Sequence, residues 1–181
     1  MKVWRLRGHD LLTIMGLDPG TRWAGVGFVT LNAARQIQHV HHELLVLPPK
    51  AHLAERLLHL DSHLSELLER FKPQHVAVEQ IFLGKNADSA FKLGHARGVC
   101  LMNVHKSGAE VFEYAPKSIK KGVTGMGSAG KEQVQMVVKN LLALPQNLDM
   151  KDDVSDALAV AIHHARYIQV QQKLRNQGAN L

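Results

Sequence analysis

The periodicity of apolar residues changes once along this sequence, and the change limits the folds that the chain can adopt. Residues 11–18, 23–31 and 36–47 are short apolar or alternating segments separated by turn signals such as Pro19-Gly20, a pattern typical of consecutive strands. From about residue 51, segments with a helical period alternate with short apolar ones. Consecutive strands pair antiparallel and helical crossovers join parallel strands. The pattern therefore predicts a mixed sheet.

The second half of the chain is predicted to supply two further strands and the helices. Leucines recur at spacings of four and three over residues 51–71, which predicts a helix with one apolar stripe, ended by Pro73. The remaining expected elements are strands at 75–82 and 110–114 and helices at 86–105, 131–144 and 153–172, with a helical turn from Pro116. The predicted fold class is α/β, with a mixed five-stranded sheet and helices on both faces.

The length of 181 residues suits a single domain, and the sequence contains no internal repeat or linker. We interpret residues 1–10 as an N-terminal appendage before the first strand and residues 11–173 as one domain. Residues 174–181 lack apolar periodicity and are expected to fray as a C-terminal tail.

Charge and cysteine content indicate the kind of binding partner and the cellular compartment of the protein. Lys and Arg exceed Asp and Glu by 22 to 16, a net charge of +6, which suits a polyanionic partner. The one cysteine excludes an internal disulfide framework and fits a reducing compartment, so a cytoplasmic location is expected. The sequence lacks an apolar run of about 18 residues, so no membrane association is expected.

Several acidic residues stand in segments that are otherwise apolar. Asp18 ends the first predicted strand, Glu79 lies within the strand at 75–82, and Asp153 and Asp156 open the last helix. A buried carboxylate without a partner is costly, so each needs an explanation. Asp18 alone fits a turn before Pro-Gly as well as it fits a metal ligand, and Asp153 alone is best explained as a helix cap. Glu79 has no basic neighbour along its strand, so the structural explanation is weaker there.

Taken together, these positions favour convergence on one site. Adjacent strands lie about 4.8 Å apart, so two strand carboxylates can meet at one sheet edge. Asp153 and Asp156 share a helix face, as do Asp152 and Asp156, so spacing leaves Asp152 as an alternative to Asp153. Two carboxylates at ~4 Å repel by roughly 4 kcal/mol at an effective dielectric of 20. We therefore expect Mg²⁺ or Mn²⁺, with room for two ions, an arrangement that hydrolyses phosphodiesters.

Seven segments, in this order, resemble the RuvC family of Holliday-junction resolvases. The resemblance covers about residues 13–165, with extra residues before the first strand and a slightly longer segment at 146–152. The matching segments are residues 16–21 (GLDPGT), 78–82 (VEQIF), 85–90 (KNADSA), 94–98 (GHARG), 112–116 (FEYAP), 125–129 (GMGSA) and 153–159 (DVSDALA).

The resemblance implies a ribonuclease-H-like fold and assigns roles to individual residues. It implies that Asp18, Glu79, Asp153 and Asp156 are the catalytic metal ligands, and its Asp-x-x-Asp frame selects Asp153 over Asp152. It implies that Lys120 and Lys131 contact DNA near the scissile phosphate and that Phe82 stacks on bases near the crossover. We add Lys85 and Lys121 as further DNA-binding candidates.

Simpler explanations exist for the residues outside the acidic set. Phe82 fits a core aromatic residue, and Lys120 and Lys121 fit a solvated helix face. The loop at 125–131 has most of a phosphate-loop pattern, but Glu132 stands where Ser or Thr should be, so we reject a nucleotide site there and favour a contact of Lys131 with a DNA phosphate. The histidines lack the spacing of a closed zinc site.

The predicted function is that of a metal-dependent endodeoxyribonuclease that resolves four-way (Holliday) junctions by paired symmetric nicks, in homologous recombination and DNA repair. The resemblance implies 5′-phosphate and 3′-hydroxyl products, a homodimer and cooperation with the RuvA–RuvB branch-migration complex. The helix at 86–106 is the expected dimer interface. Two alternatives are a non-catalytic junction-binding protein and a less selective ribonuclease-H-like nuclease.

Overall fold

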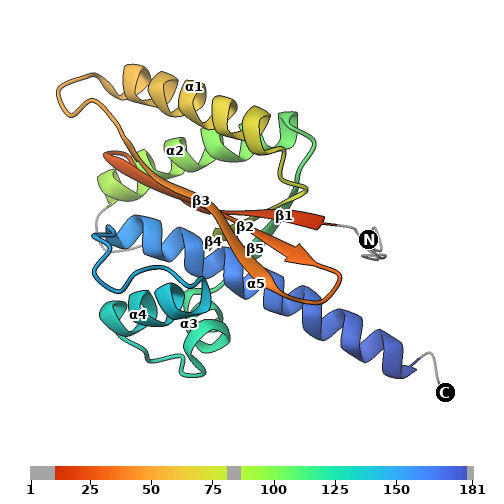
Figure 1. Ribbon diagram of the computed structural model, residues 1–181. Coiled ribbons are helices and arrows are strands. Elements are labelled where there is room, and N and C mark those ends of the chain that lie inside the picture. The colour runs from red at the N-terminus through yellow and green to blue at the C-terminus, as the bar shows by residue number, and fades with distance from the viewer. Residues whose placement is uncertain (1–10, 81–86, 179–181) are drawn as a thin grey trace.

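The computed structural model describes residues 11–80 and 87–178, which form one sheet with helices on both faces (Figure 1). The strands lie in the order β3-β2-β1-β4-β5. Strands β1, β2 and β3 pair antiparallel, whereas β4 pairs parallel with β1 and β5 pairs parallel with β4. The predicted mixed five-stranded sheet is therefore confirmed. The strands are β1 (Leu11–Asp18), β2 (Trp23–Asn32), β3 (Ile37–Val46), β4 (His75–Glu79) and β5 (Glu110–Tyr114).

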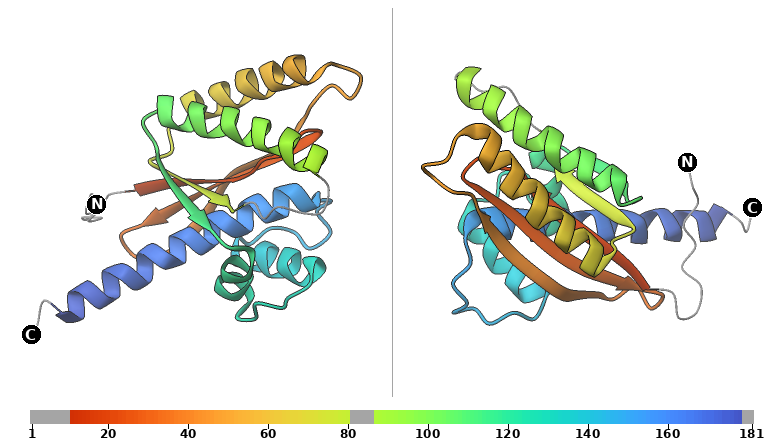
Figure 2. Two further views of the ribbon diagram at one scale, coloured as in Figure 1. Left: turned by 180° about the vertical axis from the view of Figure 1, so that it is seen from behind. Right: turned by 90° about the horizontal axis from the view of Figure 1, so that it is seen from above.

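Helices cover the two faces of the sheet unequally, as the views in Figure 2 show. Helices α1 (Leu53–Phe71) and α2 (Ala87–Lys106) pack together on one face. Helix α5 (Asp152–Gly178) crosses the other face, and α3 (Pro116–Thr124) and α4 (Lys131–Leu141) pack against it. Each face of the sheet therefore has its own buried apolar layer.

Alternation along the strands distributes side chains between these layers. On β1, Ile14 is buried in the α5 layer and Met15 and Leu17 in the layer of α1 and α2. On β4, Ala77 packs on the α5 side and Val78 on the opposite side. Because successive strand residues point to opposite faces, the residue that follows Leu17 and the residue that follows Val78 both point toward α5.

Some element ends differ from the sequence prediction. Strand β4 ends at Glu79 rather than at residue 82, and α4 ends at Leu141 because Ala143 adopts a left-handed conformation (φ 53°) before Pro145. Helix α5 continues to Gly178, beyond the end at about residue 172 that the sequence predicted, and the fraying expected of residues 174–181 stays a prediction. Leu174, Arg175 and Gln177 are good helix formers and do not need an apolar stripe to extend the helix.

The predicted appendage at residues 1–10 and the last residues, 179–181, lie outside the described residues, and the division into domains stays a prediction. Within residues 11–80 and 87–178, no helix has both the length and the apolar character needed to span a membrane.

Candidate active site

Asp18 and Glu79 are the last residues of two neighbouring parallel strands. The register pairs Leu17 of β1 with Val78 of β4, and each carboxylate is the next residue along its strand. Alternation turns both side chains toward α5. The predicted meeting of these two strand carboxylates at one sheet edge is therefore what the topology produces.

Two glycines let the start of α5 lie directly on this edge. Gly25 of β2 pairs with Asp18, and a Cβ atom on Gly25 would lie 1.9 Å from the main-chain oxygen of Asp153. A Cβ atom on Gly16 would lie 1.8 Å from the main-chain oxygen of Ala157. No other amino acid leaves room for the helix backbone at these two positions. The close packing brings the first two turns of α5, with Asp153 and Asp156, over the end of β1.

The ionisation of Asp18 shows how the four acidic residues act on one another. Burial raises the pKa of Asp18 from 3.8 to about 7, and the negative charges of Asp156, Asp153 and Glu79 contribute to this rise, whereas Lys131 lowers the pKa. Burial and Asp156 also raise the pKa of Glu79. The four carboxylates that the sequence singled out thus belong to one electrostatic cluster.

The same interactions distinguish Asp153 from Asp152. The charge of Asp153 raises the pKa of both Asp18 and Asp156, whereas Asp152 acts on Asp156 but is absent from the charges that shift Asp18. The Asp152 side chain is 59% exposed and forms an ion pair with Lys131, with 3.2 Å between Nζ and Oδ2. Asp152 is therefore held at the surface by Lys131, and Asp153, whose charge also acts on Asp18, is the better candidate for the fourth acidic ligand.

The donor set of this cluster fits a hard divalent cation. Its ligands are carboxylate oxygens, and the raised pKa values of Asp18, Glu79 and Asp156 reflect burial and mutual repulsion that a cation would relieve. The side chains form a loose cluster, because no three His, Cys, Asp or Glu residues in the described chain are already arranged as a metal-binding group. A divalent ion would therefore have to draw these side chains inward.

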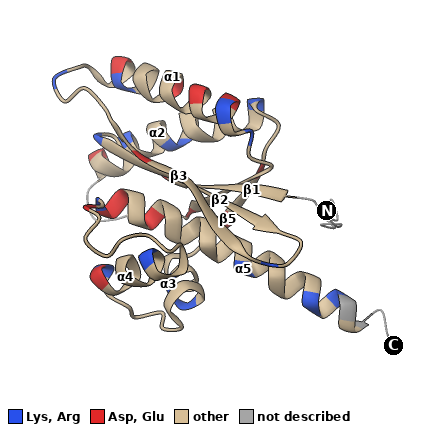
Figure 3. Ribbon diagram, in the orientation of Figure 1, with Lys and Arg blue, Asp and Glu red and all other residues tan. Residues whose placement is uncertain are grey.

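Among the described residues, Lys131 and Lys120 are the lysines whose charges act on this site. Lys131, the first residue of α4, lies 3.9 Å from the Oδ2 atom of Asp156. The positive charge of Lys120 on α3 lowers the pKa of Glu79 and of Asp156. Figure 3 shows the acidic start of α5 on the same side of the sheet as the basic residues of α3 and α4. Both lysines that the resemblance placed near a phosphate thus lie beside the acidic cluster.

The other DNA-binding candidates are not part of this cluster as described. Lys121 is exposed, and its charge is not among those that shift the pKa of Asp18, Glu79 or Asp156. Phe82 and Lys85 lie outside the described residues, in the segment 81–86 that follows β4 and Gln80. Their proposed contacts with DNA stay predictions.

A buried polar chain behind Glu79 was missed from the sequence. Tyr114 pairs with Glu79 across β4 and β5, and its hydroxyl lies 2.6 Å from Nδ1 of His164 on α5. Nε2 of His164 lies 2.8 Å from Nδ1 of His75, at the start of β4. Burial lowers the pKa of His164 to about 3 and that of His75 to about 4. The available signal was the pair His163-His164, which directly follows the apolar run at residues 157–162.

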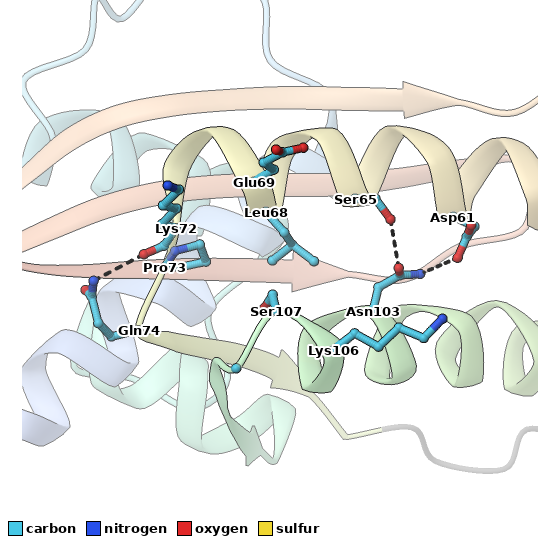
Figure 4. A pocket seen from close by; sticks show the side chains of 11 residues that line it. Asp61, Ser65, Leu68, Glu69, Lys72, Pro73, Gln74, Asn103, Lys106 and Ser107 are labelled. Atoms are coloured by element: carbon cyan, nitrogen blue, oxygen red, sulfur yellow. Dashed lines mark hydrogen bonds between the residues drawn. The ribbon is translucent and has the colours of Figure 1, made fainter.

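A separate cavity lies at the opposite end of the sheet. It has a volume of about 660 Å³ and lies between the C-terminal ends of α1 and α2, where Figure 4 shows Asn103 bonded to Ser65 and Asp61. The lining mixes Lys72 and Lys106 with Asp61 and Glu69, so it has no dominant charge. None of the predicted site residues lines this cavity, which is distinct from the carboxylate cluster.

This fold, with an acidic cluster where β1, β4 and α5 meet and two lysines beside it, defines a candidate phosphodiester-cleaving enzyme. The model of the family described as Crossover junction endodeoxyribonuclease RuvC matches residues 14–164. The chain belongs to this family, and its fold is the ribonuclease-H-like fold that the resemblance implied.

Individual relatives agree with the family match. A protein from Bdellovibrio bacteriovorus, named Crossover junction endodeoxyribonuclease RuvC, is 49% identical over 85% of this chain and 90% of its own length. One of the same name from Pelotomaculum thermopropionicum is 44% identical, over 91% and 99%. Thermus thermophilus RuvC, solved in complex with a Holliday junction substrate, superposes with a TM-score of 0.81 at 32% identity and covers 88% of this chain and 96% of that one.

Proposed function

We propose that this chain cuts four-way DNA junctions by paired symmetric nicks, as a crossover junction endodeoxyribonuclease in recombination and repair. The observation that carries the proposal is the acidic cluster at the end of β1 and β4, with Lys131 beside it, in a chain of the RuvC family. The Thermus thermophilus relative was solved with a Holliday junction as its substrate, which supports this choice of DNA structure.

Asp18, Glu79, Asp153 and Asp156 would hold Mg²⁺ or Mn²⁺, and two ions suit the four carboxylates. When bound, such ions would supply an activated water and would offset charge on the phosphate. The protein's part is to bring the four carboxylates to one end of the sheet. Lys131 already lowers the pKa of Asp18 and Asp156, and so favours the charged forms that bind a cation.

The lysines also provide contacts for the DNA backbone. Lys131 is 64% exposed, so its ammonium group can exchange the exposed Asp152 for a phosphate oxygen without breaking a buried contact. Lys120 acts on the same carboxylates from α3. We assign Lys120 and Lys131 to the phosphate next to the cut, and Lys121, Lys85 and Phe82 to DNA farther from it, the last as a base-stacking residue. Phosphate contacts position the DNA, so sequence preference must come from elsewhere.

A homodimer supplies the second cut, and we propose that α2 forms its interface. Phe91 on this helix is 73% exposed and Met102 is 44% exposed, and they line a groove of about 580 Å³ together with Gly94 and Gly98. A Cβ atom on Gly94 or Gly98 would contact nothing within 4 Å in the subunit. The subunit itself therefore does not need glycine at these positions, whereas a closely packed second helix would.

The cellular setting follows from the same proposal. A junction nuclease acts where the chromosome is, so we propose a cytoplasmic enzyme in a bacterial cell, working with the RuvA–RuvB branch-migration complex. The excess of basic residues suits the DNA partner.

A cleavage assay tests the proposed function. The substrates are a four-way junction, a linear duplex and an RNA–DNA hybrid, each with Mg²⁺, with Mn²⁺ and with a chelator. We expect metal-dependent nicks, paired across the junction, and little cutting of the other two. Asp18→Asn should abolish cleavage and keep junction binding. Binding without cleavage by the unmodified protein would indicate a junction-binding protein, and equal cutting of all substrates would indicate a less selective nuclease.

A further inference from the structure

Arg97 of α2 contacts the ends of two adjacent strands at once. Its Nη1 group donates a hydrogen bond of 2.7 Å to the main-chain oxygen of Glu79. Its Nη2 group lies 2.9 Å from Oε1 of Glu113 on β5, in an ion pair. The Arg97 side chain is only 12% exposed, whereas that of Glu113 is 44% exposed. A nearly buried guanidinium therefore joins β4 and β5 beside the acidic cluster.

The chemistry of this contact suits arginine in particular. The guanidinium group is planar and directs several N–H donors in fixed directions, so it holds two acceptors in one fixed geometry, whereas the donors of a lysine ammonium rotate. Glu79 is the last residue of β4, and Gln80 donates its main-chain N–H to the main-chain oxygen of Tyr114. Arg97 thus binds the main-chain oxygen of Glu79 at the point where strand pairing ends. A hydrogen bond from a fixed donor holds this carbonyl group in place.

Arg97 acts on the main chain of Glu79 rather than on its carboxylate. The charges that act on that carboxylate are those of Asp156, Lys120 and Lys131, and Arg97 is not among them. The effect of Arg97 is therefore one of placement. A fixed Cα position at Glu79 limits the directions that its side chain can take on the α5 side of the sheet.

We propose that Arg97 is a positioning residue that holds Glu79 where its carboxylate can share a divalent cation with Asp18, so that Arg97 sets the affinity of the site for that cation. This inference rests on the proposed function, because it takes Glu79 as a metal ligand. It adds a residue that contacts neither the cation nor the phosphate. The same helix carries the proposed dimer face, so subunit association and the placement of Glu79 depend on one element.

Direct binding of Mn²⁺ to the full-length protein tests this inference without any cleavage step. Free Mn²⁺ is measured by its electron paramagnetic resonance signal in a titration at pH 8, where the acidic cluster is largely ionised. Loss of groups that orient metal ligands typically weakens metal affinity by about 10-fold to 100-fold, so we expect roughly a 10-fold loss for Arg97→Gln. Arg97→Lys keeps the charge but not both contacts, and Glu113→Gln keeps an acceptor, so both should lose less.

The matched control is Lys106→Gln, which removes one positive charge from the far end of α2 and should bind Mn²⁺ as the unmodified protein does. Thermal unfolding of every variant separates placement from stability. An unchanged Mn²⁺ affinity in folded Arg97→Gln overturns the inference, even if its melting temperature falls, and leaves the proposed function intact. If Arg97→Gln does not fold, Arg97→Lys and Glu113→Gln decide, and unchanged affinity in both overturns the inference. Failure of the unmodified protein to bind Mn²⁺ overturns the proposed function and the inference with it.

Discussion

The main-chain oxygen of Asp153 occupies the space in which a side chain on Gly25 would lie, 1.9 Å from the Cβ position. Gly25 pairs with Asp18 across β1 and β2. This single contact therefore sets how closely the first turn of α5 approaches the strand carboxylates, and substitutions at Gly25 should affect both the fold and the site.

Gly25→Ala should displace the start of α5 and separate Asp153 from Asp18. Overpacking of this kind costs about 1–3 kcal/mol of stability, which denaturant unfolding will measure. Misplacement of catalytic groups by about 1 Å can cost roughly 100-fold in rate, and we expect a loss of that order in junction cleavage. Gly127→Ala is the stability control, because the nearest atom to its Cβ would be at 3.4 Å, an ordinary contact. Wild-type stability and activity in Gly25→Ala would contradict this packing of α5 on the strand.

Asp18→Asn should remove activity and stabilise the metal-free protein at high pH. The folded state raises the pKa of Asp18 from 3.8 to about 7, so folding favours the protonated form. The stability contributed by this protonated form is fully present below about pH 4 and is lost as the pH rises toward 7. Asn imitates the neutral form. We expect the substitution to raise the free energy of unfolding by about 2 kcal/mol at pH 8 and to leave it unchanged at pH 4. The value at pH 8 is smaller than the full pKa shift corresponds to, because solvent screening reduces it.

The measurement is the free energy of unfolding of both proteins at pH 4 and pH 8 in the presence of a chelator. Mg²⁺ at pH 8 should stabilise the unmodified protein and not Asp18→Asn. A destabilised Asp18→Asn protein at pH 8 would show that this carboxylate is not under repulsion from its neighbours.

Asp153→Asn and Asp152→Asn should differ sharply in cleavage rate. Asp153 acts on Asp18, whereas Asp152 is exposed and bound to Lys131 in an ion pair worth about 0–1 kcal/mol. We therefore expect near-normal cleavage for Asp152→Asn and near-complete loss of cleavage for Asp153→Asn. For comparison, the cleavage rate of Lys131→Gln should fall by about 100-fold, the usual effect of removing one group that stabilises developing charge. If Asp152→Asn lost cleavage and Asp153→Asn kept it, Asp152 would be the metal ligand and Asp153 would not.

Tyr114→Phe should destabilise the protein by about 1–2 kcal/mol, because it leaves a buried His164 nitrogen without its 2.6 Å hydrogen bond. The buried histidines also predict a response to acid. Their folded pKa values, about 3 and about 4, lie below the ordinary 6.5, so their contribution to stability is present above pH 6.5 and is lost as the pH falls toward 4. Unfolding measured from pH 8 to pH 4 checks both effects. His164→Gln should weaken the acid response, and an unchanged response would contradict this assignment.

Gly98→Arg should convert the proposed dimer to a monomer without damaging the subunit. The subunit leaves open space around Gly98, and replacing a helical glycine removes a penalty of about 0.5–1 kcal/mol. Light scattering after gel filtration measures the mass, and thermal unfolding measures the subunit. Paired nicks on one junction should become single nicks. A dimer of unchanged stability would place the interface elsewhere.

The sequence was sufficient to predict the sheet and its acidic edge, because both depend on local patterns. The change from a strand meander to alternating helices and strands determines which strands are parallel, and that places Asp18 beside Glu79 at one edge. The choice between Asp152 and Asp153 was different. Spacing on a helix allows both, and only the resemblance selected Asp153. The packing of the Asp153 main chain against Gly25 supplies a physical reason for that choice, which the sequence pattern does not contain.

The sequence pattern did not predict the long-range contacts of individual polar side chains. The sequence does not distinguish Arg97 from an ordinary surface arginine. Nothing in the residue pattern indicates that its guanidinium group binds the main-chain oxygen of Glu79. The contact between His164 and His75 joins residues 89 positions apart, and no periodicity links them. Such contacts depend on the final register of helix and sheet, which apolar patterns fix only to within about a turn.

The most direct test of the acidic site is a crystal of the protein grown with Mn²⁺ above pH 7, measured at a wavelength where manganese scatters anomalously. We predict anomalous density in contact with carboxylate oxygens of Asp18, Glu79, Asp153 and Asp156, with those side chains drawn together. Well-ordered carboxylates with no manganese between them, or manganese bound only at other residues, would contradict the account.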